Sequence, residues 1–452
     1  MNRRELLKST ITAAAGVTAL SALSSSSQAD MAMKHGAKPG VLMDGSQSKP
    51  CFIENGTVIR PQKPISTISE CDVLVVGAGP AGCTAAIAAA RAGCKVTIVE
   101  RYNHFGGLAT GGLVLVILGH WTRANKGAEP ISVCQGIGEE YMQRLEAMPY
   151  GIVNRRPGVN PTIDAEAYKY LLVEMLTEAN VEIFLHSWAT DAIMDGNVCK
   201  GAIFESKSGP HAILAKQVID TTGDGDIFAA AGAIHQVRKY HTGLVHRLGG
   251  LDKVDQSKRA GQPPVRGLGD VTPVPGVKWV NMGGPDIDGV DVKELTRLEL
   301  SHRKQIWKSY LDIRSKPGYE NTVMLETAPQ MGVRVTRVIE GVKTLTVDGL
   351  KNNATFDDFL TYSGAWGGDH QKWQIPLGAF LPKNVDNILT AGRSISGEPL
   401  MSDVIRVIPT CWVTGHAVGA AAAVAVKTNV LARNVDCNAV RDLLRDQKAY
   451  LG

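Results

Sequence analysis

The chain has 452 residues, of which 44% are hydrophobic and 20% are charged, and its formal net charge is +4. This length exceeds one compact domain, and the composition is that of a globular protein with a sizeable core. Near the N-terminus stand Arg3, Arg4, Glu5 and Lys8, and without them the remainder carries 45 positive and 43 negative residues, a balance of +2. A nucleic-acid surface is therefore not predicted.

The first 29 residues have the form of an export signal. Arg3 and Arg4 precede a weakly apolar run of small residues at 11–23, and Ser27-Gln28-Ala29 places small residues before a cleavage point. The run is shorter than the ~20 residues that span a bilayer. We expect a twin-arginine signal peptide over 1–29, recognition by the export machinery, a periplasmic or otherwise exported mature protein, and no membrane span in it. An uncleaved amphipathic tail is the alternative.

A mature N-terminal arm is predicted next, because residues 30–69 are rich in Gly, Pro, Ser and Lys and show no periodicity. The eight cysteines of the chain show no C-x-x-C pair and no Cys/His group with the spacing of zinc ligands. We therefore predict no disulfide framework, no metal site and no cysteine-ligated iron–sulfur cluster.

A strand–turn–helix–strand unit with a glycine motif occupies residues 72–100. Gly77 permits the tight turn, Gly79 lets the backbone approach a pyrophosphate, and Gly82 lets the helix lie close to the sheet. Glu100 ends the second strand, where it can accept hydrogen bonds from ribose hydroxyls and would repel a 2′-phosphate. The unit predicts a dinucleotide site at the N-terminus of the helix, and a glycine-rich surface loop is the alternative.

Further glycine-rich and strand-like segments follow. The segment 101–114 contains four glycines, and Asp164 is expected to cap a helix at 165–179. Alternating segments then predict one strand of the main sheet and a small meander. The meander leads into a buried strand that ends in a second glycine turn at 221–226, which predicts a contribution to the same crevice. An ordinary loop is the alternative at this turn.

The pattern changes over residues 240–380, where strands, a helix at 291–311 and aromatic-rich loops predict an inserted α+β substrate domain. An apolar strand and a small-residue helix then return at 387–428. We therefore predict a discontinuous cofactor domain made of residues 70–239 and 381–452, with the substrate domain inserted between its two parts.

In this order the chain resembles the bacterial FAD-dependent oxidoreductase family, a group of glutathione-reductase-like flavoproteins with relatives among geranylgeranyl reductases and the flavin subunit of heterodisulfide reductase. The resemblance covers about residues 70–430. It is carried by six segments: DVLVVGAGPAG, ERYNHFGGLATGGLV, VIDTTGDGD, GVRVTRVIEG, IPLGAFLP and NILTAGRSISGEPLMSDVIRVIPTCWVTGHAVGAAAA.

The resemblance implies an α/β fold, with a Rossmann-like FAD-binding domain of three-layer ββα architecture and FAD as the cofactor. It implies cofactor contacts at Gly77, Gly79, Pro80, Ala81, Gly82, Glu100, Arg101, Gly106, Gly107, Thr110, Gly223, Asp224, Gly392, Arg393 and Thr410. Many flavoproteins of this fold carry an acid at the position of Arg393, which leaves a direct contact of Arg393 with the ribityl chain open. A covalent flavin link at His104 is not predicted. The N-terminus of the last helix is expected to face the flavin and favour its reduced, negatively charged form.

Proton-transfer candidates are His241, His246, His370 and His416, because imidazole titrates near working pH. His370 is the first choice because it lies between two tryptophans, just before the chain re-enters the cofactor domain, and His246 is the second. For each of them, a surface or hydrogen-bonded core histidine is the alternative.

Arg334 and Arg337 stand on opposite faces if their segment is extended and on one face if it is helical. One of them, with Arg334 the candidate, could clamp an anionic oxygen of the substrate, and a solvated charge is the alternative.

Together these features predict an exported FAD-dependent dehydrogenase or reductase that moves two electrons, as hydride, between a small organic substrate and FAD. A quinone, a cytochrome or oxygen is the expected partner couple. The alternative is a flavoprotein whose FAD is structural or only relays electrons to a protein partner. The sequence does not name the substrate.

Overall fold

The structure is a computed structural model, and it describes residues 50–123, 127–364 and 371–452. The chain divides into two compact units, residues 1–64 and residues 65–452. All the described candidate residues belong to the second unit.

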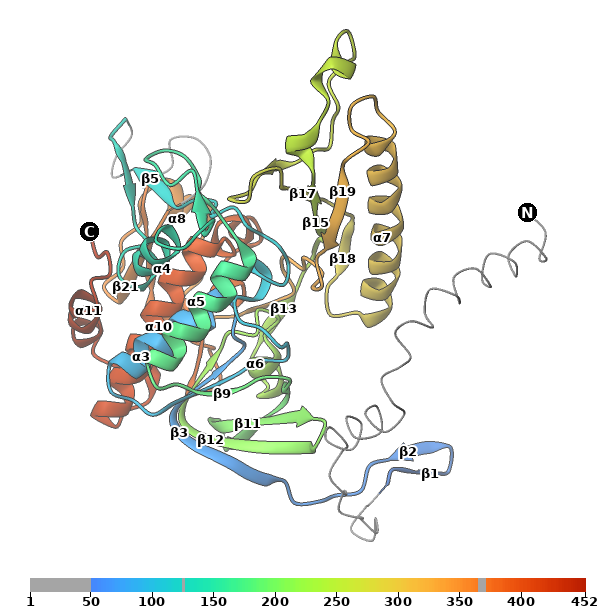
Figure 1. The fold of residues 1–452 in the computed structure, drawn as a ribbon. Helices are drawn as coiled ribbons and strands as arrows, with labels where there is room; N and C mark the ends of the chain where they lie inside the picture. The colour runs from blue at the N-terminus through green and yellow to red at the C-terminus, as the bar shows by residue number, and fades with distance from the viewer. Residues whose placement is uncertain (1–49, 124–126, 365–370) are drawn as a thin grey trace, which may run out of the picture. The chain divides into compact units, whose positions relative to one another are not determined.

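A two-stranded hairpin forms in the described part of the first unit. Strand β1 (Phe52–Glu54) pairs antiparallel with β2 (Thr57–Ile59) (Figure 1). Asn55 and Gly56 join them with φ angles of 49° and 77°, and two successive positive φ angles are typical of a type I′ hairpin turn. The sequence interpretation of this region as an arm did not include the hairpin, although Asn-Gly is a strong hairpin signal.

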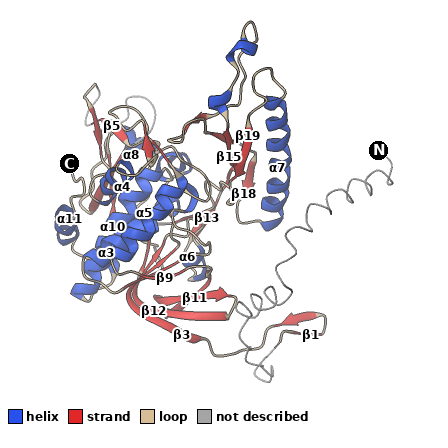
Figure 2. Cartoon of the chain, viewed as in Figure 1, coloured by secondary structure: helices blue, strands red, loops and turns tan. Residues whose placement is uncertain are grey.

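A seven-stranded sheet organises the second unit (Figure 1, Figure 2). Its strands are β3 (Ser66–Val76), β4 (Val96–Val99), β9 (Glu182–Phe184), β10 (Trp188–Asp195), β11 (Val198–Ser206), β12 (Gly209–Asp220) and β23 (Ile388–Thr390). The order is β10-β11-β12-β3-β4-β9, and β23 pairs with β12. Strands β3, β4, β9 and β23 continue in parallel from β12, whereas β10, β11 and β12 form an antiparallel meander.

The two faces of β3 carry alternate side chains into different cores. Val73 and Val75 pack in the cluster that also contains the helices, whereas Leu74 and Val76 pack with Phe204 of the meander. The helices of this layer are α3 (Pro80–Arg91), α4 (Ile137–Glu146), α5 (Ala165–Glu178), α10 (Ile408–Thr428) and α11 (Cys437–Asp446). The arrangement of meander, sheet and helices confirms the three-layer ββα prediction.

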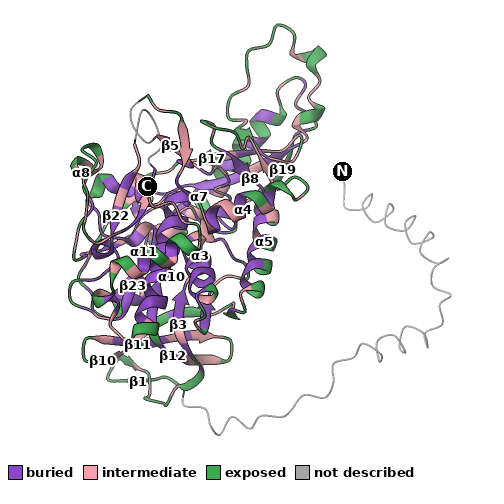
Figure 3. Ribbon diagram, turned by 90° about the vertical axis from the view of Figure 1, so that its left-hand side faces the viewer, coloured by how far each residue is buried: buried purple, intermediate pink, exposed green. Residues whose placement is uncertain are grey.

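Helices α3 and α10 pack against each other through glycine and alanine. A Cβ atom on Gly415 of α10 would overlap the backbone oxygen of Ala81 in α3, and one on Gly419 would overlap the backbone oxygen of Ala85. Helix α10 is long and apolar enough to cross a membrane, with a mean hydropathy of 1.2, but its whole apolar window is buried inside the protein (Figure 3). Its apolar composition is therefore accounted for by close packing in the core.

A second sheet and a long helix form the layer that follows in sequence. The antiparallel sheet has the order β16-β17-β15-β19, with β15 (Leu244–Gly249), β16 (Asp270–Val271), β17 (Lys278–Met282) and β19 (Val323–Thr327). Helix α7 (Val292–Arg314) packs on it, and Asp291 caps α7 by accepting hydrogen bonds from the N–H groups of Lys293 and Glu294. The predicted helix at 291–311 is thus confirmed.

The remaining elements are short. They are β5 (Trp121–Arg123), β6 (Pro130–Ser132), β7 (Ile152–Val153), β8 (Thr162–Ile163), α6 (Asp226–Ala230), β13 (His235–Val237), β14 (Lys239–His241), β18 (Asp286–Asp288), β20 (Arg337–Ile339), α8 (Val347–Lys351), β21 (Phe359–Ser363), β22 (Trp373–Pro376) and α9 (Ser402–Ile405). Leu360 of β21 and Trp373 of β22 belong to the same core cluster as α10. Part of the segment 240–380 therefore packs with the helix layer, and the proposed domain boundaries remain a prediction.

Gly419→Ala should destabilise the protein, although alanine normally favours a helix over glycine by about 1 kcal/mol. The added methyl would force α3 and α10 apart, and overpacking of this kind costs about 1–3 kcal/mol. Chemical denaturation followed by circular dichroism would measure the change.

Gly138→Ala in α4 is the matched control, because its Cβ would meet its nearest neighbours at 3.4 Å, an ordinary contact. This variant should be neutral or slightly more stable. Equal stabilities for the two variants would contradict the close packing of α3 and α10.

Candidate functional site

A cavity of about 410 Å³ lies where β3, β12 and β23 end and where α3 and α10 begin. Carboxyl ends of parallel strands and amino ends of helices meet there, which is the usual ligand position in open α/β sheets. The residues that line it include Gly79, Glu100, Arg393, His241, Arg334 and Arg406.

The first glycine turn has the geometry that its spacing predicts. Gly77 has φ +93°, and a Cβ there would lie 2.6 Å from the backbone oxygen of Thr221; a Cβ on Gly82 would overlap the backbone oxygen of Gly77. At Gly79, in contrast, a Cβ would meet nothing within 4 Å, and this residue begins α3 without a side-chain cap. The turn thus leaves the first N–H groups of α3 open to an anionic ligand in the cavity.

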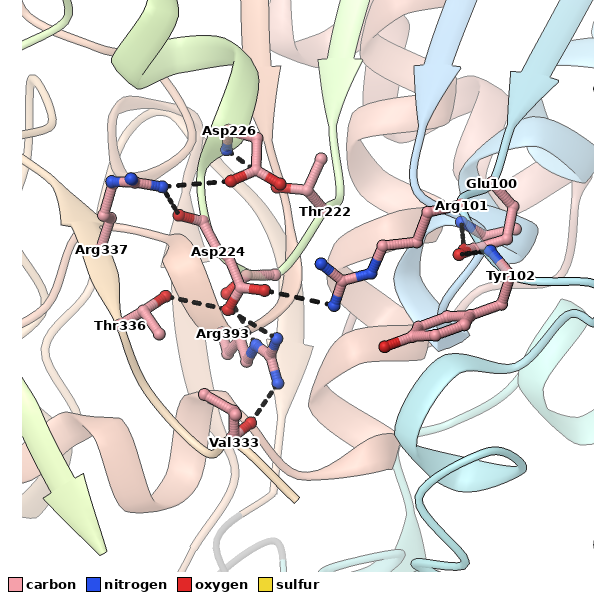
Figure 4. Close-up of polar contacts among 12 residues, drawn as sticks. Glu100, Arg101, Tyr102, Thr222, Asp224, Asp226, Val333, Thr336, Arg337 and Arg393 are labelled. Carbon is pink, nitrogen blue, oxygen red and sulfur yellow. Dashed lines mark hydrogen bonds and ion pairs between the residues drawn. The ribbon is translucent and has the colours of Figure 1, made fainter. Parts of the chain in front are cut away.

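Glu100 is held at the edge of this turn. Its two carboxylate oxygens accept hydrogen bonds from the backbone N–H groups of Ala78, at 2.7 Å, and Tyr102, at 3.0 Å (Figure 4). Burial raises the pKa of Glu100, and these two hydrogen bonds act in the opposite direction. Each carboxylate oxygen has a second lone pair, so Glu100 can still accept hydrogen bonds from ribose hydroxyls.

The second glycine turn follows β12 and is fixed by buried Asp220. The Asp220 carboxylate accepts hydrogen bonds from the N–H groups of Thr222, Ile227 and Phe228, each at 3.0 Å. Burial raises its pKa, and the hydrogen bonds that it accepts counteract this effect. This network orients the turn, so that Thr222 and Gly223 line the cavity.

Asp224 connects two arginines of the cavity wall, Arg101 and Arg393. Its Oδ1 lies 2.9 Å from Arg393 Nη2 and accepts a hydrogen bond from Thr336, while its Oδ2 lies 3.5 Å from Arg101 Nη2 (Figure 4). Arg393 also donates from Nε to the Gly223 oxygen at 2.6 Å. The cationic groups of both arginines are therefore opposed by one buried carboxylate.

Arg337 lies on the far side of the same turn. It donates to the backbone oxygen of Asp224 at 3.0 Å and to Asp226 Oδ1 at 3.1 Å. Burial, followed by the charges of Asp224 and Asp220, raises the pKa of Asp226 to about 6. Arg337 thus stabilises the second glycine turn, and it does not line the cavity.

Arg334 points elsewhere, as the extended interpretation of its segment predicts. It donates from Nη1 to the backbone oxygen of His241 at 2.9 Å and from Nη2 to Asn281 Oδ1 at 3.4 Å. Burial and the charge of Arg406 lower its pKa. Of the two arginines whose faces the sequence left open, Arg334 is the one in the cavity wall.

His241 stands beside Arg334 in a stack of rings. Its ring centroid lies 4.4 Å from that of Tyr240, with an angle of 28° between the planes, and Arg406 Cζ lies 5.7 Å from the Tyr240 centroid. Asp403 accepts a hydrogen bond from the Tyr240 hydroxyl and one from Arg406 at 3.1 Å. Burial, then Arg334 and Arg406, lower the pKa of His241, which keeps its imidazole neutral at neutral pH.

The other histidine candidates lie differently. His246 is 4% exposed, is absent from the cavity wall, and has a pKa lowered to about 4 by burial. His416 is buried in α10, bonds to Gln447 at 2.7 Å and also has a pKa lowered to about 4. His370 lies outside the described residues. Among the described candidates, the cavity contains His241 alone.

Most predicted cofactor residues are brought together. Those in the wall are Gly77, Gly79, Pro80, Ala81, Glu100, Arg101, Gly107, Gly223, Gly392 and Arg393. Those outside it are Gly82, Gly106, Thr110, Asp224 and Thr410. The hydroxyls of Thr110 and Thr410 instead bond to the backbone oxygens of Phe105 and Val404.

Sequence reasoning missed Arg406 and Trp188. Arg406 stands two residues before α10, and Trp188 begins β10, where Arg101 Cζ lies 4.9 Å from its ring centroid. Only the position of Arg406 directly before a small-residue helix could have indicated a role. Trp188 carries no comparable signal, because its approach to Arg101 depends on the folding of the meander.

These residues fit FAD. The open space at Gly79, the uncapped start of α3 and the buried Glu100 suit a pyrophosphate and a ribose without a 2′-phosphate. The same cavity continues to Val407, which begins α10, again without a side-chain cap. A second uncapped helix therefore starts at the cavity wall, where it favours negative charge.

Comparisons with known proteins agree with this fit. The model of the family described as FAD dependent oxidoreductase matches residues 72–256 and 257–444. Digeranylgeranylglycerophospholipid reductase 2 of Methanopyrus kandleri is 32% identical over 177 residues, which are 37% of this chain and 42% of that protein. A tRNA uridine 5-carboxymethylaminomethyl modification enzyme of Pelobacter propionicus is 29% identical over 255 residues, which are 52% of this chain and 34% of that protein. This chain thus matches less than half the length of these relatives.

Solved structures with a similar fold include the flavin-dependent brominase Bmp2, at 14% identity and a TM-score of 0.46, with 84% of this chain and 83% of that chain covered. A geranylgeranyl bacteriochlorophyll reductase-like protein of Thermoplasma acidophilum has 15% identity and a TM-score of 0.43, with 84% and 82% covered.

Gly79→Val should fold and yet lose the cofactor. The branched side chain would meet no protein atom near its Cβ, and it would occupy the space before α3 that a pyrophosphate needs. The wild type should be yellow and release FAD on denaturation, whereas the variant should be colourless with an unchanged far-ultraviolet circular dichroism spectrum.

Gly283→Val is the control for this test, because Gly283 also has open space around its Cβ and does not line the cavity. It should retain FAD. Stoichiometric FAD in Gly79→Val, or release of NADP from the wild type, would contradict the assignment.

Proposed function

The chain belongs to the family of FAD-dependent oxidoreductases, and we propose that it is an exported enzyme of that family, which acts on a small organic substrate. FAD supplies the chemistry by accepting or giving up two electrons as hydride. A quinone, a cytochrome or oxygen is proposed as the partner couple, because an exported enzyme has no access to the cytoplasmic nicotinamide pool.

One observation carries the substrate proposal: the cavity that holds the dinucleotide turn also contains a histidine and two arginines besides those at the cofactor turns. Gly79 and Glu100 line one part of it, and His241, Arg334 and Arg406 line another. A cofactor site alone does not require the second group. The apolar residues Val245 and Trp279 also line the cavity, so it combines apolar walls with a few polar groups, as substrate pockets do.

His241 is proposed as the proton-transfer residue. It lines the cavity, and its imidazole forms no hydrogen bond to another residue in the part of the chain that the structure describes. The lowered pKa leaves the ring neutral and able to accept a proton from the substrate while hydride leaves it. The alternative candidate His370 remains a prediction.

The rival function is a flavoprotein whose FAD is structural or only relays electrons to a protein partner. Anaerobic mixing with a panel of small alcohols, amines and acids separates the two. Rapid bleaching of the flavin absorbance by a panel member would support the enzyme, whereas a flavin that only a reduced protein partner can bleach would support the relay.

His241→Asn should keep FAD bound and slow flavin reduction by the bleaching substrate about 10²- to 10⁴-fold, the usual contribution of a positioned base. In the wild type the reduction rate should stay constant through neutral pH and decrease only as pH falls below 6.5. The reason is that the pKa of His241 lies below that ordinary value, so only acid protonates the base.

The pH profile also distinguishes His241 from a merely structural residue. The charges near its ring are Arg334, Arg406, Asp286 and Asp403. Arg406→Gln removes one of the two positive charges and should move the acid limb to higher pH, whereas His241→Asn should abolish this limb. A wild-type rate and profile in His241→Asn would contradict the assignment and direct the test to His370.

Export is proposed from the twin arginine and the apolar run of the first 29 residues. Replacing Arg3 and Arg4 together by Lys should leave the protein in the cytoplasm with its FAD bound. Cell fractionation with an antibody against the mature chain would measure this. Lys8→Gln is a control that removes a nearby charge and should be exported; export of the double Lys variant would contradict the twin-arginine assignment.

A further inference from the structure

Two arginines converge on the part of the cavity that contains His241. Arg334 comes from the segment before β20, and Arg406 from the turn between α9 and α10. Both line the cavity, and they are close enough that the charge of Arg406 lowers the pKa of Arg334. Bringing two like charges together in a partly buried site costs free energy unless a negative charge opposes them.

The protein supplies little negative charge at this point. Arg334 forms no ion pair within residues 50–123, 127–364 and 371–452, and its two polar contacts are a backbone oxygen and an amide oxygen. Arg406 is paired with Asp403, but this carboxylate also accepts the hydroxyl hydrogen of Tyr240. The two guanidinium groups therefore face one carboxylate, which is itself shared.

The arginines at the cofactor turns are arranged differently. Arg101 and Arg393 both face Asp224, and Arg337 faces Asp226. Each of these three is within ion-pair distance of a carboxylate that the chain supplies. Arg334 is not, so its guanidinium group is a cation of the cavity wall without an ion pair among the described residues.

Unused hydrogen-bond donors accompany this charge. A guanidinium group has five N–H donors, and Arg334 uses two of them in its bonds to His241 and Asn281. Arg406 donates one to Asp403, and its buried Nε has no partner among the described residues. Planar donors of this kind match the two oxygens of a carboxylate.

We propose that Arg334 and Arg406 bind the carboxylate of a small organic acid and thereby hold its reacting carbon near His241. The claim that this acid is a substrate rests on the proposed oxidoreductase function, whereas the anion site itself does not. Val245 and Trp279 form apolar wall nearby, and they suit the carbon skeleton of such an acid. Because the same cavity must also hold FAD, we expect the acid to be small.

Binding to the FAD-loaded protein tests the proposal without turnover. Acetate, succinate and benzoate would be titrated, each beside its neutral amide, together with inorganic phosphate. The readouts are the flavin difference spectrum and the melting temperature. At least one carboxylate should bind about 10-fold or more tightly than its amide, because charge-assisted hydrogen bonds to arginine depend on the anion.

Arg334→Gln and Arg406→Gln should each weaken binding of that carboxylate by about 10- to 100-fold while FAD content stays at the wild-type level. Arg303→Gln is the matched control. It removes the same charge from α7 of the neighbouring layer, where Arg303 pairs with Glu299 and does not line the cavity. This control should bind the carboxylate as the wild type does.

Four outcomes would overturn the proposal: no carboxylate binds better than its amide, phosphate alone binds, the affinities survive both substitutions, or the variants lose FAD instead of the acid.

The proposed function would fail on different results. Bleaching of the flavin by a neutral compound, without carboxylate binding, would reject the anion site and keep the enzyme. Carboxylate binding without bleaching by any compound would support the anion site and reject the dehydrogenase.

Discussion

The close approach of α3 to its neighbours is the constraint on which the site depends. Gly82 lets α3 lie against the Gly77 carbonyl, and Gly415 lets α10 lie against the Ala81 carbonyl. A side chain at either glycine would separate these elements. Both contacts involve the first turn of α3, and the two uncapped N-termini open into one cavity. The site thus takes positive potential from two helix N-termini that backbone packing positions, before any cationic side chain is added.

Charged side chains then make the two parts of the cavity different. At the cofactor turns Asp224 opposes Arg101 and Arg393, so the helix N-terminus remains the main partner for a pyrophosphate. Around His241, Arg406 pairs with Asp403, whereas Arg334 has no ion pair among the described residues. The same two arginines that could hold an anion also lower the pKa of His241 and favour its neutral imidazole.

The sequence predicts local features well and long-range contacts poorly. Residue spacing alone predicted the glycine turn at 77–82 and the helix that Asp164 caps, because the geometry of each is set by neighbouring residues. The three layers were predicted from the family resemblance and not from spacing. In contrast, Arg406 meets Tyr240 from a segment 166 positions away in the chain, and no periodicity records such a meeting. The pair Asn55-Gly56 is a local signal for a hairpin turn, but the prediction of an N-terminal arm did not include the hairpin. Thr410 was placed correctly on its helix, but its hydroxyl turns to the Val404 oxygen.

The arginine at position 393 shows how such contacts depend on one another. Many flavoproteins of this fold carry an acid there, and here Arg393 instead pairs with Asp224. A Cβ on Gly223 would lie 2.5 Å from Arg393 Nε, so the guanidinium fits only because residue 223 is glycine. A carboxylate at 393 would face Asp224 and raise the energy of both charges. An acid at position 393 would therefore require a change at Asp224 as well. The residues at positions 223, 224 and 393 thus depend on one another in this chain.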